Sequence, residues 1–208
     1  MGSLNTNLKA TVAALLRPVS LVLAFGVASG ASAQDVMQEV LQDPAAVNLS
    51  QLDEAELLTR LADADPHDAA ALERELMALW SHSGSPSMDL LLRRGRDAME
   101  RGDWQAAIEH LTALTDHAPD FAEGWSERAR AFFHADLFGP AVADLERALA
   151  LNPNDYNAIY GLGQVFEYFR DPERAYAAYA RAKAIHPNHE EVTKALDRLS
   201  GEVNGQAL

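Results

Sequence analysis

Cysteine is absent from the 208-residue sequence. Its absence excludes disulfide bonds, thiolate catalysis and a lipid-bearing cysteine. Aromatic residues are also few, at 7%, whereas 48% of the residues are hydrophobic. Alanine is abundant among the hydrophobic residues, which favours closely packed helices over a β-sandwich. The fold is therefore expected to be held together by helix packing alone.

Basic residues are scarce relative to acidic ones. The chain carries 17 Lys and Arg residues against 31 Asp and Glu residues, and its formal net charge is −14. Such an excess of negative charge disfavours nonspecific binding to nucleic acid or to anionic lipid. We therefore expect no nucleic-acid partner. The partner is expected to be either basic or selected without regard to charge.

The apolar run Val19–Val27 is shorter than the roughly 20 residues that a membrane-spanning helix needs. Lys9 and Arg17 precede this run, and the small residues Ala31-Ser32-Ala33 follow it. This layout is typical of a secretory signal peptide. Residues 1–33 are therefore expected to be cleaved after Ala33, which leaves an exported, periplasmic protein without a stable membrane anchor. The alternative is an uncleaved anchor.

Small residues and prolines recur with a fixed period of 34 residues. The recurring positions are Pro119, Pro153 and Pro187, then Ala107, Ala141 and Ala175, and then Gly95, Ala129 and Gly163. A period of this length is typical of stacked helical hairpins. Small residues let the two helices of a hairpin cross closely, and each proline ends the second helix. The repeat units are expected at residues 88–121, 122–155 and 156–189.

These units resemble tetratricopeptide repeats. Trp125 stands at the tryptophan position of that pattern, and Leu162, Gly163 and Phe166 fill its L-G-x₂-Y segment in the last unit. The resemblance implies an all-α fold, a right-handed α-solenoid of helical hairpins. It also implies a non-enzymatic protein–protein interaction module.

Three positions depart from the tetratricopeptide pattern. Arg94 and Arg128 stand where leucine is usual, and Leu114 stands where alanine is usual. Two interpretations of Arg128 are open. It either pairs with Asp144 across the hairpin or is an ordinary solvated arginine.

The repeat units are flanked on both sides. Residues 34–49 are expected to be a linker, and residues 50–86 a degenerate N-terminal hairpin that caps the array, with Ser50 as the N-cap of its first helix. Residues 190–201 are expected to be a C-terminal capping helix that ends at Gly201.

The sequence shows no catalytic constellation. The metalloprotease, nucleophile-elbow and phosphate-loop motifs are all absent. Gly161-Leu162-Gly163 falls inside an expected helix and is not a phosphate loop. His186 and His189 form the one close histidine pair, but they straddle Pro187, so their rings are not expected to share a face. We therefore expect no enzymatic activity, no cofactor and no metal site.

The resemblance to tetratricopeptide repeats also implies a concave groove lined by the first helix of each hairpin. The positions that point into it are Asp89, Leu92, Arg96, Met99 and Glu100, then Glu123, Ser126, Arg130, Phe133 and His134, and then Asn157, Tyr160, Gln164, Glu167 and Tyr168. The candidate ligand residues among them are Arg96, Met99, Arg130, Phe133, His134, Tyr160, Gln164 and Tyr168.

Arg96 and Arg130 are the basis of a ligand hypothesis. Two guanidinium groups in the groove of an acidic protein predict recognition of a carboxylate, either a C-terminus or an acidic side chain of the partner. The neighbouring aromatic residues would seat an apolar anchor. In the alternative interpretation the arginines only neutralise nearby acids, which are Glu100, Glu123 and Glu127.

Two functions follow from these expectations. The first is an adaptor or assembly factor that binds a peptide or protein segment in the groove. The second is a self-associating structural scaffold of the cell envelope, and the oligomeric state is left open. The carboxylate clamp of Hsp70- and Hsp90-binding repeats requires lysine and asparagine at set groove positions, and the sequence lacks them, so that partner class is not predicted.

Overall fold

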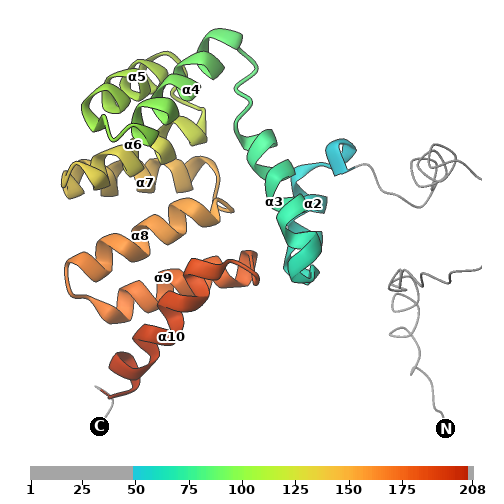
Figure 1. Cartoon of the computed structure of the whole chain (residues 1–208), viewed down its shortest axis with the longest axis vertical. Helices are drawn as coiled ribbons and strands as arrows, with labels where there is room; N and C mark the ends of the chain where they lie inside the picture. Colours follow the sequence, from blue (N-terminus) through green and yellow to red (C-terminus); the bar gives the residue numbers. More distant parts are fainter. Residues whose placement is uncertain (1–48, 206–208) are drawn as a thin grey trace, which may run out of the picture. The chain divides into compact units, whose positions relative to one another are not determined.

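The computed structural model describes residues 49–205, and this part of the chain consists of helices without a β-strand. Six of the helices form three antiparallel pairs that follow one another in chain order (Figure 1). The pairs are α4 (Pro86–Glu100) with α5 (Trp104–His117), α6 (Ala122–His134) with α7 (Phe138–Leu151), and α8 (Tyr156–Tyr168) with α9 (Pro172–Ile185). The predicted all-α solenoid of hairpins is confirmed. The expected signal peptide and residues 34–48 of the expected linker lie outside the described residues.

The two helices of each hairpin cross at small residues. The alanines on the second helices, Ala107, Ala141 and Ala175, are fully buried. A Cβ atom added to Gly163 would lie 2.3 Å from a ring carbon of Tyr179, and one added to Gly95 would lie 2.5 Å from Cγ of Leu111. These distances are far below van der Waals contact, so glycine is what allows the large partner side chain to fill the crossing.

Each hairpin turn contains one residue with a left-handed backbone conformation, and these residues recur every 34 positions. Gly102, Asp136 and Arg170 have φ values of 71°, 59° and 60°. Glycine adopts this conformation freely, whereas it costs Asp136 and Arg170 about 1 kcal/mol each. The period of the sequence therefore extends to the backbone of the turns.

Arg128 forms an ion pair with Asp144 across the second hairpin, which decides between the two interpretations of this arginine. Its Nε and Nη2 atoms donate to Oδ2 and Oδ1 of Asp144 at 2.6 and 2.9 Å, a bidentate geometry. Its Nη1 atom donates to the Thr115 hydroxyl on α5 at 2.7 Å. The arginine at the usual leucine position thus connects α5, α6 and α7.

An N-terminal hairpin precedes the repeats. It consists of α2 (Glu54–Asp63) and α3 (Pro66–Trp80), after the short 3-10 helix η1 (Leu49–Gln51). The expectation that Ser50 caps the first helix is wrong, because Ser50 lies within η1 and Asp53 is the N-cap. The Asp53 carboxylate accepts the backbone N–H of Glu56 at 2.9 Å.

The N-terminal hairpin packs on the C-terminal end of the array instead of continuing the stack in front of α4. Its buried leucines and Trp80 share one hydrophobic cluster with residues of α8, α9 and α10: Tyr156, Ile159, Ala175, Tyr179, Ala182, Val192, Ala195 and Leu199. The Asn188 side chain also donates to the carbonyl oxygen of Ala64 at 2.7 Å. The expected capping hairpin therefore shields apolar residues of the last repeat.

The last helix, α10 (Glu190–Gly205), covers α9 with Val192, Ala195 and Leu199, which are buried. It was expected to end at Gly201, but it continues past this residue. One glycine in a helix interior costs about 1 kcal/mol, which packing of the preceding turns offsets. Within residues 49–205, no helix has both the length and the apolar character needed to cross a membrane.

The helix crossing predicts opposite effects for two glycine-to-alanine substitutions. Gly163→Ala should lower the free energy of unfolding by about 1–3 kcal/mol, because the new methyl group overlaps the Tyr179 ring. Gly201→Ala is the matched control: it also lies in a helix, has open space around its Cα and should raise stability by up to about 1 kcal/mol. Urea unfolding followed by far-UV circular dichroism measures both. Equal effects of the two substitutions would contradict the close crossing.

Candidate functional site

A cavity of about 390 Å³, here called the groove cavity, lies on α6 and α8, the first helices of the second and third hairpins. Its lining residues are Met77, Glu123, Ser126, Glu127, Ala129, Arg130, Phe133, His134, Leu145, Asn157, Tyr160, Gly161, Gln164, His189 and Glu191. The candidate ligand residues that the structure brings together here are Arg130, Phe133, His134, Tyr160 and Gln164. Arg96, Met99 and Tyr168 lie elsewhere.

The N-terminal hairpin supplies one wall of the groove cavity. Met77 reaches it from α3, and the Asn157 amide on α8 donates to the Met77 sulfur at 3.5 Å. His189 and Glu191, at the start of α10, supply another wall. Sequence reasoning missed the Met77 contribution, because the sequence does not specify which helices the N-terminal hairpin contacts.

The guanidinium group of Arg96 binds partners within the chain. Its Nε atom donates to Glu127 at 2.5 Å, its Nη1 atom donates to the Ser81 hydroxyl at 2.8 Å, and its Nη2 atom pairs with Glu123. These contacts tie α4 to α6 and to the end of α3. Two of the three acids in the alternative interpretation, Glu123 and Glu127, are thus the partners of Arg96.

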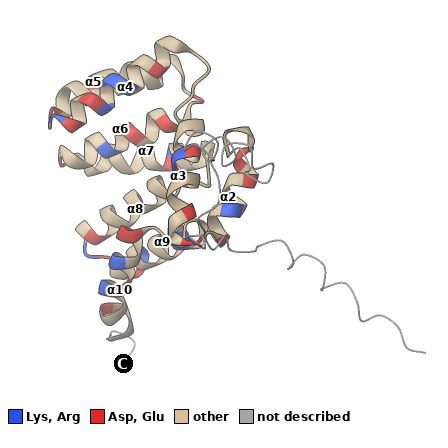
Figure 2. Cartoon of the chain, turned by 45° about the vertical axis from the view of Figure 1, so that its right-hand side comes forward, with Lys and Arg blue, Asp and Glu red and all other residues tan. Residues whose placement is uncertain are grey.

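Arg130 keeps an exposed surface toward the groove cavity. Its Nη2 atom pairs with Glu127 at 2.6 Å, but 54% of its side chain is exposed to solvent. Glu127 therefore lies between Arg96 and Arg130: it accepts a hydrogen bond from Arg96 and forms an ion pair with Arg130. Basic and acidic positions are interspersed along these helices (Figure 2). Arg130 is the guanidinium group of this cluster that a ligand can approach.

Burial changes the ionisation of Glu123 and Asp155 in this cluster. Glu123, Glu127 and Asp155 are only 8%, 7% and 2% exposed. Burial, together with the negative charges of Glu127 and Asp155, raises the pKa of Glu123 to about 8, although Arg96 and Arg130 act in the opposite direction. The cluster thus contains three carboxyl groups and two guanidinium groups. A proton retained on Glu123 balances the charge of the cluster.

His134 contributes an aromatic ring and not a charge. Burial and the nearby Arg130 lower the pKa of His134, so its imidazole is neutral at pH 7. Its ring stacks on Trp104 with centroids 4.7 Å apart. The Phe133 ring meets His134 edge-on at 5.7 Å. This part of the groove wall is therefore apolar and rigid.

Tyr168 and Met99, both predicted in the groove, have other environments. Met99 is 7% exposed and packs in the core of the first hairpin. Tyr168 is 56% exposed and stacks on Phe138 with centroids 3.8 Å apart, next to Phe169, which is 61% exposed. The three rings form an aromatic edge at the hairpin turns. Phe169 was missed because it lies outside the groove register.

His186 and His189 lie in contact, contrary to the expectation that their rings do not share a face. Their ring centroids are 5.4 Å apart, because the turn between α9 and α10 brings both rings against Tyr156. His186 is buried, and its Nε2 atom lies 3.7 Å from Glu73 of α3. Among residues 49–205, no group of three or more His, Asp or Glu side chains has a geometry that could hold a metal ion. The pair instead forms part of the surface that holds the N-terminal hairpin.

A family model described as tetratricopeptide repeat matches residues 92–139 and 136–190. A TPR repeat-containing protein of Rhizobium etli is 26% identical over 141 residues, which are 66% of this chain and 69% of that protein. A bovine protein SGT1 homolog is 31% identical over 119 residues, 55% of this chain but only 34% of that protein.

Among solved structures, the first TPR of Spaghetti (RPAP3), bound to the HSP90 peptide SRMEEVD, is similar with a TM-score of 0.55 and 27% identity. The match covers 58% of this chain and 95% of that structure. Residues 92–190 therefore match the tetratricopeptide repeat, and the α-solenoid has the architecture of known tetratricopeptide domains.

The buried Glu123 carboxyl predicts how stability depends on pH. Its pKa in the folded protein, about 8, is higher than its usual 4.5, so folding takes up a proton between these values. The resulting stability is fully present below the lower value and is lost as pH rises through about 8. Unfolding free energy, measured in urea, should fall by about 3 kcal/mol from pH 6 to pH 9.

Two variants isolate this effect. Glu123→Gln removes the titrating group and should flatten the fall. Glu146→Gln, at an exposed position on α7, should leave it unchanged. An equally steep fall in Glu123→Gln and in the unmodified protein would show that another group titrates.

Proposed function

We propose that this protein is a non-enzymatic adaptor or assembly factor that binds a peptide or protein segment in the groove cavity. The observation that carries the proposal is the exposed guanidinium group of Arg130 next to an aromatic wall, in a cavity of about 390 Å³. The groove cavity combines apolar side chains with convergent polar and charged groups, and such a combination can fix the orientation of a ligand. The peptide-bound state of the Spaghetti (RPAP3) domain supports a peptide as the class of ligand.

The chemistry of the groove cavity indicates which features the segment would carry. Arg130 would pair with a carboxylate, because a guanidinium group matches it in shape and charge. The amides of Asn157 and Gln164 would hydrogen-bond to the peptide backbone. Phe133 and Tyr160 would hold an apolar side chain between them. The proposed ligand is thus an extended segment with an acidic residue beside an apolar one.

We place this activity in the periplasm. The pattern at residues 1–33 supports export, because a short apolar run follows basic residues and ends at an A-x-A cleavage site. The absence of cysteine means that the fold needs no disulfide in that compartment. The mature protein would begin at Gln34. These residues lie outside the part of the chain that the structure describes.

Arg130→Gln should abolish partner binding without unfolding the protein. The variant removes the exposed charge but keeps a polar side chain, and Glu127 retains Arg96 as its partner. Arg93→Gln, on the exposed surface of α4 and outside the groove cavity, is the matched control. Chains that begin at Gln34 are immobilised and exposed to a periplasmic extract. Quantitative mass spectrometry should find partners retained by the control and depleted about tenfold on Arg130→Gln.

Equal retention by both variants, with unchanged helical content, would contradict groove binding. Sedimentation of the protein over a range of concentrations tests the alternative function, self-association. If the alternative holds, the captured species is the chain itself, and the protein sediments as an oligomer. Arg96 is unsuitable for this test. Its removal would leave Glu123 and Glu127 buried without their partner, so loss of binding could result from unfolding.

A further inference from the structure

The turns within the second and third hairpins expose apolar side chains next to each other. The aromatic edge of Phe138, Tyr168 and Phe169 is extended by Leu137, which is 46% exposed. Tyr168 and Phe169 are more than half exposed. We call these four residues the turn patch. Large apolar groups that gather on a surface, instead of lying there singly, mark an interaction site.

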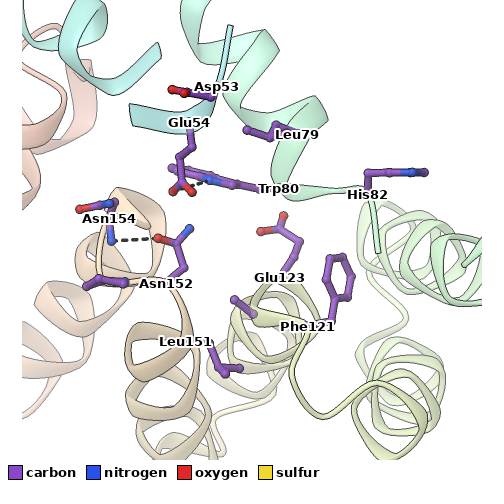
Figure 3. Close-up of a pocket in the computed structure, with 12 residues that line it drawn as sticks. Asp53, Glu54, Leu79, Trp80, His82, Phe121, Glu123, Leu151, Asn152 and Asn154 are labelled. Carbon is purple, nitrogen blue, oxygen red and sulfur yellow. Dashed lines mark hydrogen bonds between the residues drawn. The ribbon is translucent and has the colours of Figure 1, made fainter. Parts of the chain in front are cut away.

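The N-terminal hairpin lies on a different part of the array. Trp80, at the end of α3, faces Glu123 at the start of α6 and Asn152 after α7 across a cavity of about 520 Å³ (Figure 3). The Trp80 indole N–H donates to Glu54 at 3.0 Å, and Glu123 pairs with Arg96, so these groups have partners within the chain. No segment within residues 49–205 covers the turn patch in a comparable way.

Leu137 stands where the other two hairpins have a capping aspartate. Asp103 and Asp171 are one period before and after it, and each accepts a backbone N–H at the start of α5 or α9. Leu137 cannot form this bond, so α7 begins without a side-chain cap. A cap of this kind stabilises a helix. The second hairpin therefore lacks a stabilising bond and exposes a leucine in its place, which indicates a contact outside the chain.

Two opposite charges flank the turn patch. Asp136 precedes Leu137 and Arg170 follows Phe169, and the two charged residues are one period apart. Both are exposed, and within residues 49–205 neither side chain forms an ion pair or a hydrogen bond. Both also have the left-handed conformation that Gly102 adopts without strain in the first turn. Charged residues thus stand at two positions where the backbone favours glycine.

The turn patch and its flanking charges are complementary to a second copy of themselves. In a pair with two-fold symmetry, every contact between two different residues occurs twice, with the roles of the copies exchanged. If the second turn of one copy meets the third turn of the other, Asp136 of each copy faces Arg170 of the other. The apolar side chains of the two turns then pack against each other. Contact between like turns would instead bring equal charges together.

We propose that two copies of this chain associate through the turn patch about a two-fold axis. Both copies use the same surface, so assembly stops at two chains. Four partly exposed side chains supply less apolar area than the roughly 800 Å² per partner of a stable interface, so the dimer forms reversibly. No residue of the turn patch lines the groove cavity. The dimer therefore does not depend on Arg130 and leaves two groove cavities for ligands.

Sedimentation equilibrium of the chain from Gln34 measures the association. The mass should rise from one chain toward two, and no further, as the concentration increases to about 1 mM. Asp136→Arg and Arg170→Asp should each weaken association about tenfold or more, because each places like charges together at two contacts. Both substitutions introduce a residue type that the equivalent turn already uses. Glu146→Arg, at an exposed position on α7, is the matched control and should associate as the unmodified chain does.

Combining the two charge reversals should restore the dimer. In an equimolar mixture of Asp136→Arg and Arg170→Asp chains, each arginine of one variant faces an aspartate of the other, so a heterodimer should form. The double variant Asp136→Arg/Arg170→Asp should form a dimer by itself for the same reason. Charges that only stabilise their own turn would give no such recovery.

Two further variants separate association from folding. Leu137→Asn supplies the missing helix cap, so it should raise the urea midpoint of the monomer and yet weaken association about tenfold. Phe169→Ala removes an exposed ring and should also weaken association about tenfold, with little change in the urea midpoint. Unchanged association in both variants would place the interface elsewhere.

Three other results would overturn the proposal. A single-chain mass at every concentration would assign the turn patch to a different partner. A mass that grows beyond two chains would indicate open-ended association, as a scaffold requires. Failure of both the mixture and the double variant to dimerise, with unchanged helical content, would contradict the two-fold pairing. Arg130→Gln and Arg93→Gln should dimerise equally, so the dimer and groove binding can fail separately.

Discussion

Close approach of two helices at a small residue determines where every other group in the repeats lies. Gly163 can face Tyr179 only because it has no side chain, and Gly95 faces Leu111 in the same way. Repetition of this crossing every 34 residues gives the first helices of the hairpins equivalent positions. Side chains one period apart then fall on one surface, as Arg130 and Gln164 do in the groove cavity. The recognition surface is thus a consequence of packing that is itself fully buried.

Features set by local sequence were the ones that could be predicted. The first helix of each expected repeat unit begins within two residues of the expected boundary, because prolines and capping aspartates act over one turn of chain. Asp136 and Arg170 show the limit of such local rules. Their left-handed conformation leaves no mark in residue type, since only the first turn uses the glycine that this conformation favours. The only signal in the sequence was the position of Asp136 and Arg170, one and two periods after Gly102.

Contacts between distant segments could not be predicted from the same patterns. The sequence predicted a hairpin within residues 50–86, but the pattern of a helical hairpin does not specify which part of the array its buried face covers. The bond from Asn188 to Ala64 joins residues 124 positions apart, and the Met77 wall of the groove cavity depends on that docking. Arg96 is a similar case. Sequence left open whether it binds a ligand or neutralises acids, and its contacts with Glu123, Glu127 and Ser81 depend on where α3 ends.

The end of the N-terminal hairpin also joins a chain of charged groups beside the groove cavity, because the Ser81 hydroxyl accepts from Arg96. Glu123 shares Arg96 with Glu127, which in turn pairs with Arg130. Arg130 is one of the charges that lower the pKa of Glu123. A carboxylate bound at Arg130 would neutralise that charge and so favour the protonated form of Glu123. The coupling is reciprocal, so protonation of Glu123 would strengthen carboxylate binding at Arg130 by the same factor.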